Sequence, residues 1–150
     1  HRHFYCNLFI MSQYPKGINK VIRSNSNNIL IWQMKDRTIY EAIFPELMFI
    51  SAITVLELEI GVLQIERRDK KQGAVLRGWL NHHVLPAFSD RVLPVDLAVA
   101  QRCASLHVPN PKSERDAMIA ASAIESRMTI VTRNISDFSQ SGVKVFDPWI

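Results

Sequence analysis

The stretch "LMFISAITVLELEIGVLQIERR", residues 47–68, contains the change in apolar spacing that decides the fold. Its opening residues, 47–51, form a short continuous apolar run, which is typical of a strand buried on both faces. In the remainder, apolar residues recur at Val55, Leu58, Val62 and Ile65, close to the spacing of one helical face. The stretch therefore predicts a strand followed directly by a helix.

The same alternation continues toward the C-terminus. Apolar residues at helical spacing over 75–84 predict a helix that ends at the Pro86 break, and "RVLPVD", residues 91–96, predicts a strand whose Asp96 caps the helix "LAVAQRCASL". Ser113 or a neighbour opens a further helix, "ERDAMIAASAIES", whose small residues allow close packing on a sheet. "MTIVT", residues 128–132, and "VKVF", residues 143–146, predict two more strands.

The N-terminal third is less regular. "HFYCNLFI", residues 3–10, has the aromatic and β-branched content of a first strand, and "RSNSNN", residues 23–28, is a loop by composition. "ILIWQM", residues 29–34, fits a short helix as well as a short strand, because periodicity does not separate the two over so few residues. Strands that alternate with helices predict one α/β domain over residues 1–150, with a mainly parallel sheet covered by helices on both sides.

The composition, net charge and cysteine count limit the classes of protein to which this chain can belong. With 47% hydrophobic and 21% charged residues the chain has the balance of a globular domain. A net charge of +4 is compatible with a polyanionic partner such as nucleic acid, and the basic run "ERRDKKQ", residues 66–72, fits either an RNA contact or a solvated helix end. Two cysteines without paired spacing argue against a disulfide framework or a cysteine zinc site, so a cytoplasmic location is expected. No apolar run reaches a membrane span.

Acidic residues follow or precede the predicted strands in a way that suggests one shared site. Glu57 lies two turns past the strand at 47–51, Asp116 lies at the start of its helix, and Asp137 follows the strand at 128–132 within "TRNISDF". Ligand crevices in open α/β sheets lie beyond the carboxyl ends of the strands. Converging carboxylates disfavour joint ionisation, and a divalent cation resolves that conflict. Oxygen ligands favour Mg²⁺ or Mn²⁺, and the chemistry implied is phosphodiester hydrolysis.

The same acids also fit a purely structural role. Thr54-x-x-Glu57 is a capping box if Thr54 is the N-cap, and Ser113-x-x-Asp116 closely resembles one. In that interpretation each carboxylate satisfies backbone N–H groups and the positive end of a helix dipole. Asn134 and Asp137 are likewise common turn and cap residues. The spacing alone leaves both interpretations open.

Four stretches in order resemble one protein family: "FISAITVLELEIGV", "SERDAMIAASA", "MTIVTRNISDF" and "VKVFDPW". They are similar to the PIN-domain ribonuclease toxins of the VapC type, in particular the FitB-like branch, over about residues 47–150. The resemblance implies a three-layer α/β/α sandwich with a mainly parallel sheet of about four or five strands. It further implies a Mg²⁺- or Mn²⁺-dependent endoribonuclease, a homodimer, and inhibition by a small antitoxin whose complex binds operator DNA.

The resemblance also assigns individual residues. Glu57 in "TVLELEIG" and Asp116 in "ERDAMIAA" match the metal-binding acids of the family, and Asp137 with Asn134 matches the polar cluster on the second side of the metal site. Thr132 and Arg133, between the strand and this cluster, would orient it or contact phosphate.

The sequence departs from the family at its beginning. The family opens with a Leu-Asp-Thr-Asn signature whose Asp is the first metal ligand, and residues 1–46 contain no such signature. In the best local fit, "FYCNLFI", Asn7 matches the signature Asn and Tyr5 stands where Asp belongs. Tyrosine, with a pKa of about 10, is a poor ligand for a hard cation at neutral pH. Asp36 lies too far along the chain to replace it straightforwardly.

Two alternatives to an active nuclease follow. A homologue without the first ligand would keep the fold and bind antitoxin, and operator DNA as a complex, without turnover. A hydrolase of small phosphates would require a glycine-rich phosphate loop, and the five glycines of the chain are not clustered. The second alternative is therefore ranked last.

Overall fold

The structure is a computed structural model that describes residues 6–7, 48–132 and 134–147. Every strand pairing in this part of the chain is parallel. Strand β4 (Thr129–Val131) lies between β1 (Cys6–Asn7) and β5 (Val145–Phe146), whereas β2 (Ile50–Ser51) pairs with β3 (Val92–Leu93). The helices are α3 (Ala52–Arg68), α4 (Lys70–Trp79), a π-helical turn η2 (Leu80–Val84), α5 (Leu85–Ala87), α6 (Leu97–Leu106), α7 (Glu114–Glu125) and α8 (Ile135–Phe138).

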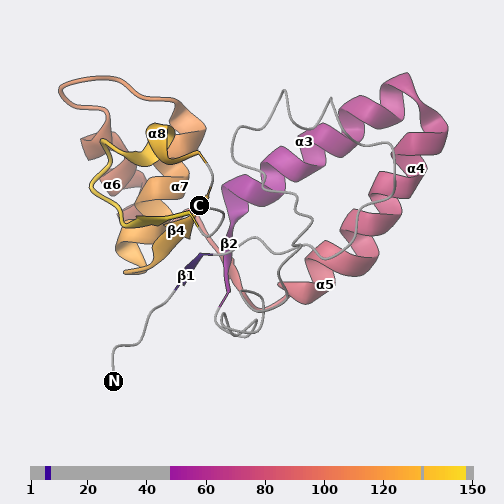
Figure 1. Cartoon of the computed structure of the whole chain (residues 1–150), viewed down its shortest axis with the longest axis horizontal. Helices are drawn as coiled ribbons and strands as arrows, with labels where there is room; N and C mark the ends of the chain where they lie inside the picture. Colours follow the sequence, from indigo (N-terminus) through magenta and orange to yellow (C-terminus); the bar gives the residue numbers. More distant parts are fainter. Residues whose placement is uncertain (1–5, 8–47, 133, 148–150) are drawn as a thin grey trace.

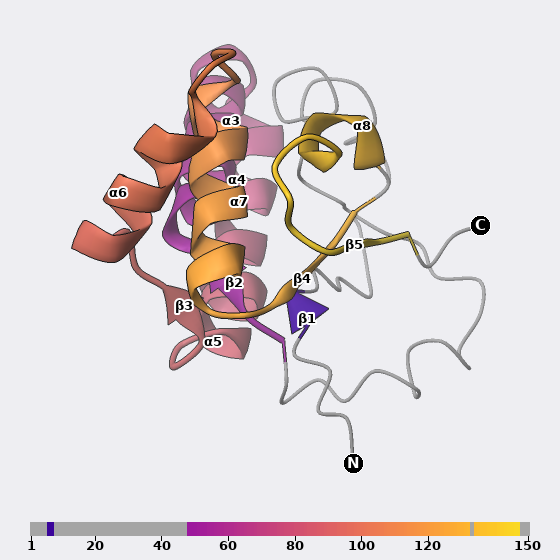
Figure 2. The same cartoon turned by 90° about the vertical axis from the view of Figure 1, so that its left-hand side faces the viewer.

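The helices flank the strands in two groups. Helices α3, α4 and α5 lie on one side of β1, β2 and β4, and α6, α7 and α8 lie on the other (Figure 1). In the turned view α7 begins at the end of the molecule where α8 lies and runs back toward the start of β4 (Figure 2). The predicted α/β class with parallel strands is confirmed. The strands are shorter than the apolar runs, and those described pair as groups of three and two instead of one continuous ladder.

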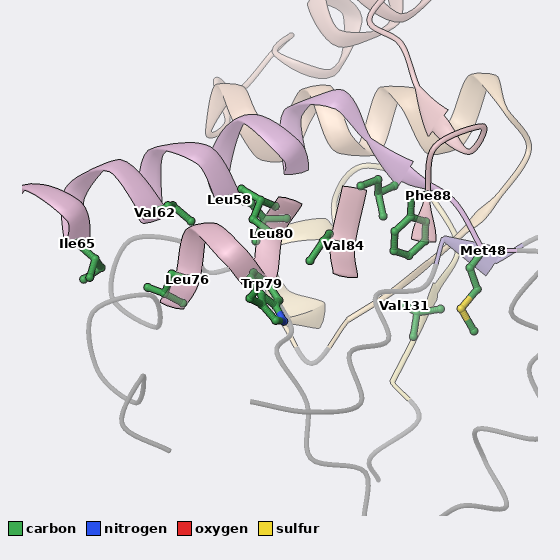
Figure 3. Packing of buried hydrophobic residues seen from close by; sticks show 11 residues of the cluster. Met48, Leu58, Val62, Ile65, Leu76, Trp79, Leu80, Val84, Phe88 and Val131 are labelled. Carbon is green, nitrogen blue, oxygen red and sulfur yellow. The ribbon is translucent and has the colours of Figure 1, made fainter. Parts of the chain in front are cut away.

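The largest hydrophobic cluster explains why the predicted helix at 52–68 forms. Its apolar stripe is buried on the side that faces α4, η2 and β2 (Figure 3). The cluster consists of Met48, Ile50, Leu58, Val62, Ile65, Leu76, Trp79, Leu80, Val84, Phe88 and Val131. Val75, included in the predicted apolar spacing of the second helix, points away from this cluster and is 49% exposed. The buried face of this helix is formed by Gly73, Leu76 and Trp79.

Helices α3 and α4 form a tight hairpin. Asp69 caps α4 by accepting hydrogen bonds from the backbone N–H groups of Lys71 and Gln72, at 3.0 and 3.1 Å. Gly73 then lies directly against α3, because a Cβ placed there would be 2.5 Å from the Cα of Glu66. Arg77 connects the two helices further, with Nη1 2.6 Å from Glu59 Oε2 and Nε 3.0 Å from Glu66 Oε1. The hairpin thus needs a glycine at its closest approach.

Several helix ends were predicted correctly. Asp96 caps α6 by accepting a hydrogen bond from Val99 N–H at 2.9 Å, as predicted. Ser113 occupies the N-cap of α7, although its side chain makes no capping hydrogen bond. The buried face of α7 includes Ala117, Ala120 and Ala121. Ala120 packs in a cluster with Ile130 of β4, as predicted, whereas Ala117 and Ala121 cluster with Val99 and Cys103 of α6.

Two predicted boundaries were wrong. Helix α3 begins at Ala52 with Ser51 as its N-cap, whose Oγ accepts from Ile53 N–H at 3.1 Å, so Thr54 is not a cap. Thr54 instead has a buried side chain inside the first turn. Pro86 does not end the second helical segment but lies within α5, at a first-turn position where its missing N–H is not needed. Phe88 then ends the helix.

Other sequence-based expectations fall outside the described residues. These are the loop at 23–28, the element at 29–34, Tyr5, Asp36 and Arg133. Within the described part of the chain, no helix has the length and apolar character required to cross a bilayer.

Candidate functional site

The three acids predicted to share a site come from three different helices. Glu57 is on α3, which follows β2, Asp116 is on α7, which precedes β4, and Asp137 is on α8, which follows β4. We call these three residues the acidic site. Because α7 runs back toward the start of β4, its first turn lies at the end of the molecule where β4 finishes and α8 begins (Figure 2). The topology therefore places Asp116 on the same side as Asp137.

Glu57 is a buried carboxylate whose environment favours its neutral form. Only 6% of the residue is exposed, and among the described residues its Oε2 has no hydrogen-bond partner. Its other oxygen, Oε1, is 3.7 Å from Nη1 of Arg115 on α7, an ion-pair distance beyond hydrogen-bonding range. Burial raises the pKa of Glu57, the charge of Arg115 opposes this, and the charge of Asp116 adds to it.

The capping interpretation does not apply to Glu57. Because Ser51 is the N-cap of α3, Glu57 lies in the second turn, and the first turn contains no acidic residue. The unpaired backbone N–H groups of a helix belong to its first turn, so Glu57 is placed too late to satisfy them. A buried carboxylate with one unsatisfied oxygen costs stability, and helix capping does not explain its presence here.

Asp116 is the third residue of α7, the position at which a capping box would place an acid. The pKa of Asp116 is raised, chiefly by burial. A hydrogen bond from the Ser113 side chain opposes this shift, the negative charge of Asp137 adds to it, and the positive charge of Arg115 opposes it. Ser113 thus interacts with the Asp116 carboxyl group instead of capping the helix with its own side chain. Asp116 is electrostatically coupled to both other acids, to Glu57 on one side and Asp137 on the other.

Asp137 is held by its own turn. The side-chain Nδ2 of Asn134 donates a hydrogen bond to Oδ2 of Asp137. The Ser136 hydroxyl donates to Oδ1 of Asn134 at 2.8 Å and lies 3.4 Å from Oδ1 of Asp137. Thr132 is buried, and its Oγ1 accepts a hydrogen bond from Asn134 N–H at 3.0 Å. Thr132 and Asn134 therefore fix the conformation of the turn that carries Asp137. Arg133, expected to assist them, lies outside the described residues.

The described residues suit a cation that needs few protein ligands. Among residues 6–7, 48–132 and 134–147, no three His, Cys, Asp or Glu side chains come close enough to form a metal-binding group. Mg²⁺ is commonly held by one or two carboxylates, with waters and substrate phosphates completing its octahedron. Glu57 and Asp116 provide such a pair, and the unpartnered Oε2 of Glu57 is an available hard oxygen donor.

Arg115 is a residue of this region that the sequence patterns did not single out. It lies in the first turn of α7, where the helix dipole disfavours a cation. A basic residue directly before a candidate metal-binding Asp, at a helix start, is the signal that would have identified it. Its contact with Glu57 depends on how α3 and α7 pack, which local sequence does not specify.

The fold is an α/β domain of parallel strands between two helical groups, in which the charge of Asp116 acts on Glu57 and that of Asp137 acts on Asp116. The chain belongs to the PIN domain family, whose model matches residues 28–142. This confirms the family inferred from the sequence motifs. The match begins within residues 1–46, the part of the chain that carries no first-ligand signature.

Named relatives support the same assignment. The chain is 34% identical to Toxin FitB of Neisseria gonorrhoeae over 114 residues, which cover 73% of this chain and 81% of that protein. It is 32% identical to VapC ribonuclease Y4jK of Sinorhizobium fredii over 69% of this chain and 76% of that protein. It is 34% identical to plasmid stability protein StbB of Pseudomonas syringae pv. tomato over 69% of this chain and 77% of that protein.

Two solved structures have a similar fold. The crystal structure of FitAcB from Neisseria gonorrhoeae matches with a TM-score of 0.68 and 32% identity, covering 75% of this chain and 84% of that one. The structure of FitAB bound to an IR36 DNA fragment matches with a TM-score of 0.68 and 31% identity, covering 76% and 82%. The chain therefore has the PIN domain fold.

Proposed function

We propose that this protein is the toxin of a type II toxin–antitoxin system and a Mg²⁺- or Mn²⁺-dependent endoribonuclease. The observation that carries the proposal is the buried Glu57 carboxylate, which has an unpartnered oxygen among the described residues and is coupled to Asp116. Within the described part of the chain no hydrogen bond stabilises this oxygen, whereas a divalent ion would satisfy it and relieve the repulsion between the two acids. The similarity to a toxin and to a VapC ribonuclease supports the same activity.

The residues would act as follows. Glu57 and Asp116 hold the ion, and Asp137 adds negative charge beside Asp116. The ion, when bound, supplies an activated water and stabilises the leaving oxygen of the phosphodiester. Asn134 orients Asp137, and Thr132 anchors the turn that presents both. Arg133 follows Thr132 directly in sequence, and we propose that it orients the acidic site or contacts a substrate phosphate.

The proposed partners follow from the relatives. Solved relatives are a FitAcB assembly and FitAB bound to DNA, so we propose that this chain binds a cognate antitoxin and contacts operator DNA through that complex. We further propose a homodimer in the cytoplasm, where its RNA substrate is found. A second protein bound near the acidic site would explain how a cell tolerates the nuclease.

Cleavage of RNA tests the activity. Purified protein should cut single-stranded RNA in the presence of Mg²⁺ or Mn²⁺ and stop when the metal is chelated. Asp116→Asn should reduce cleavage by at least about 10²-fold, whereas the matched control Asp90→Asn, an exposed acid in the turn before β3, should retain it. Equal cleavage by wild type and Asp116→Asn would show that the activity does not come from this site.

The alternative is a homologue that binds antitoxin without turnover. It is favoured by one observation, the absence of the signature Asp at the start of the chain, where the local fit places Tyr5. Calorimetry with Mn²⁺ separates the two functions, because an incomplete site should bind the ion weakly or not at all. Mn²⁺ binding that disappears in Glu57→Gln, combined with cleavage, supports the enzyme; antitoxin binding without either supports the alternative.

A further inference from the structure

Arg115 occupies a position that its own helix disfavours. It is the second residue of α7, where the unpaired N–H groups give the helix a partial positive charge. A cation there is unfavourable unless nearby anions outweigh the dipole. Glu57, across the contact between α3 and α7, and Asp116, next in sequence, provide those anions.

The two members of the Glu57–Arg115 pair differ strongly in exposure. The Glu57 side chain is 5% exposed and fixed within the helical packing, whereas the Arg115 side chain is 43% exposed. Their closest atoms are 3.7 Å apart, so the guanidinium approaches one carboxylate oxygen without a tight hydrogen bond. Arg115 can therefore leave Glu57 by rotating toward solvent, while Glu57 has no comparable freedom.

We propose that Arg115 is a built-in counter-charge for Glu57 that competes with the divalent ion for this carboxylate. In the absence of metal the guanidinium partly neutralises a buried anion that otherwise has no positive partner among the described residues. When an ion binds Glu57, the two cations repel each other and Arg115 turns outward. Arg115 is thus a positioning residue that sets how tightly the acidic site holds its metal.

This inference deepens the proposed function and rests on it only for the metal. The pairing of Arg115 with Glu57 is independent of any nuclease activity. The pairing and the competition with the metal can therefore be tested in separate experiments. The variants are Arg115→Met, which removes the charge and keeps an apolar stem, and Arg115→Lys, which retains the charge. Arg102→Met is the matched control, because Arg102 of α6 forms a closer ion pair, at 2.7 Å, with Glu125 of α7, which links a different pair of helices and lies outside the acidic site.

The first experiment measures thermal unfolding of the full chain in a chelating buffer at pH 7.5. Arg115→Met should lower Tm by about 2–4 °C, since it leaves Glu57 buried without a counter-charge, and the loss stays small because the pair is half-exposed and therefore weak. In a Glu57→Gln background the same substitution should change Tm by less than about 1 °C. An equal loss in both backgrounds would show that Arg115 acts on something other than Glu57 and would overturn the pairing.

The second experiment titrates Mn²⁺ by calorimetry. Removing the competing guanidinium should tighten Mn²⁺ binding by roughly 5- to 30-fold in Arg115→Met, with Arg115→Lys close to wild type and Arg102→Met unchanged. A residue that merely supported the fold would weaken metal binding when removed, so the direction of the change is diagnostic. Unchanged or weaker binding in Arg115→Met, with binding in wild type, would overturn the competition and leave the proposed function standing.

The remaining outcomes also discriminate. Mn²⁺ binding by Arg115→Met but not by wild type would support the competition in its strongest form. No binding by either protein would overturn both the competition and the proposed metal site, and the unfolding experiment would still decide whether Arg115 neutralises Glu57.

Discussion

Neutralising Glu57 should stabilise the metal-free protein. An ionised buried oxygen without a partner costs about 1–3 kcal/mol, and Glu57 Oε2 is such an atom among the described residues. Glu57→Gln removes this charge at nearly constant volume. It also removes the interaction with Arg115, whose half-exposed guanidinium at 3.7 Å contributes no more than about 1 kcal/mol. The net expectation is a gain of about 0.5–2 kcal/mol, or about 2–6 °C in Tm.

The gain should depend on pH in a defined direction. The pKa of Glu57 is raised above its ordinary value of 4.5, so the folded state favours the protonated carboxyl group. Wild type therefore loses stability as pH rises from about 4.5 through the raised pKa, while Glu57→Gln has no such loss. The two proteins should have similar stability at the acidic end of this range, and the advantage of the variant should grow toward neutral pH and then stay constant.

Chemical denaturation in a chelating buffer, repeated across this pH range, measures the effect. Glu125→Gln is the control, because it removes an acid of similar size from an exposed ion pair with Arg102 and should leave stability within about 0.5 kcal/mol. A variant Glu57→Gln that is less stable than wild type near pH 7.5, or a difference that does not change with pH, would refute the argument that this carboxylate is destabilising when ionised.

Three further predictions concern the hairpin, the helix caps and the metal. Gly73→Ala should cost about 1–3 kcal/mol in denaturation experiments, because its Cβ would be 2.5 Å from backbone, whereas Gly78→Ala, with its nearest neighbour at 4.0 Å, should be neutral or stabilising. Asp96→Ala should cost about 1 kcal/mol for a lost cap, and Ser113→Ala less, since Ser113 makes no side-chain cap; the reverse order would contradict the assigned roles. Mn²⁺ affinity measured by calorimetry should rise with pH as the acidic-site carboxyl groups with raised pKa values ionise, and a pH-independent affinity would exclude them as ligands.

The elements that the sequence predicted well are those with a strong periodic signal. Helix α3 spans the predicted run because its apolar stripe is long and lies against the largest hydrophobic cluster. Its N-cap was misplaced because Ser51 and Thr54 are both good cap residues, and only the end of β2 decides between them. The strands were predicted too long; for β2 and β4 this is because a buried apolar run extends beyond the residues that form ladder hydrogen bonds.

The acidic site was predictable in its parts but not in its contacts. The positions of Glu57, Asp116 and Asp137 beside strand ends follow from the alternation of strands and helices, and the structure couples the first two and the last two electrostatically. Whether all three bind a common ion remains a prediction. The contact of Arg115 with Glu57 depends on how α3 packs against α7, which no local pattern encodes. The side chain of Ser113 makes no capping hydrogen bond, although Ser113 is the N-cap residue of α7, and no local pattern encodes this either.

The strongest argument for a functional site comes from comparing Glu57 with Asp116. Asp116 is at a position where an acid also favours the helix start, so its presence alone does not require a ligand. Glu57 has no such compensation, because it lies beyond the first turn of α3 and is buried with a raised pKa. Gln would fill the same space without the charge. A residue type that lowers stability where a neutral equivalent fits is expected where the charge serves binding or chemistry, and the divalent ion that we propose would meet that requirement.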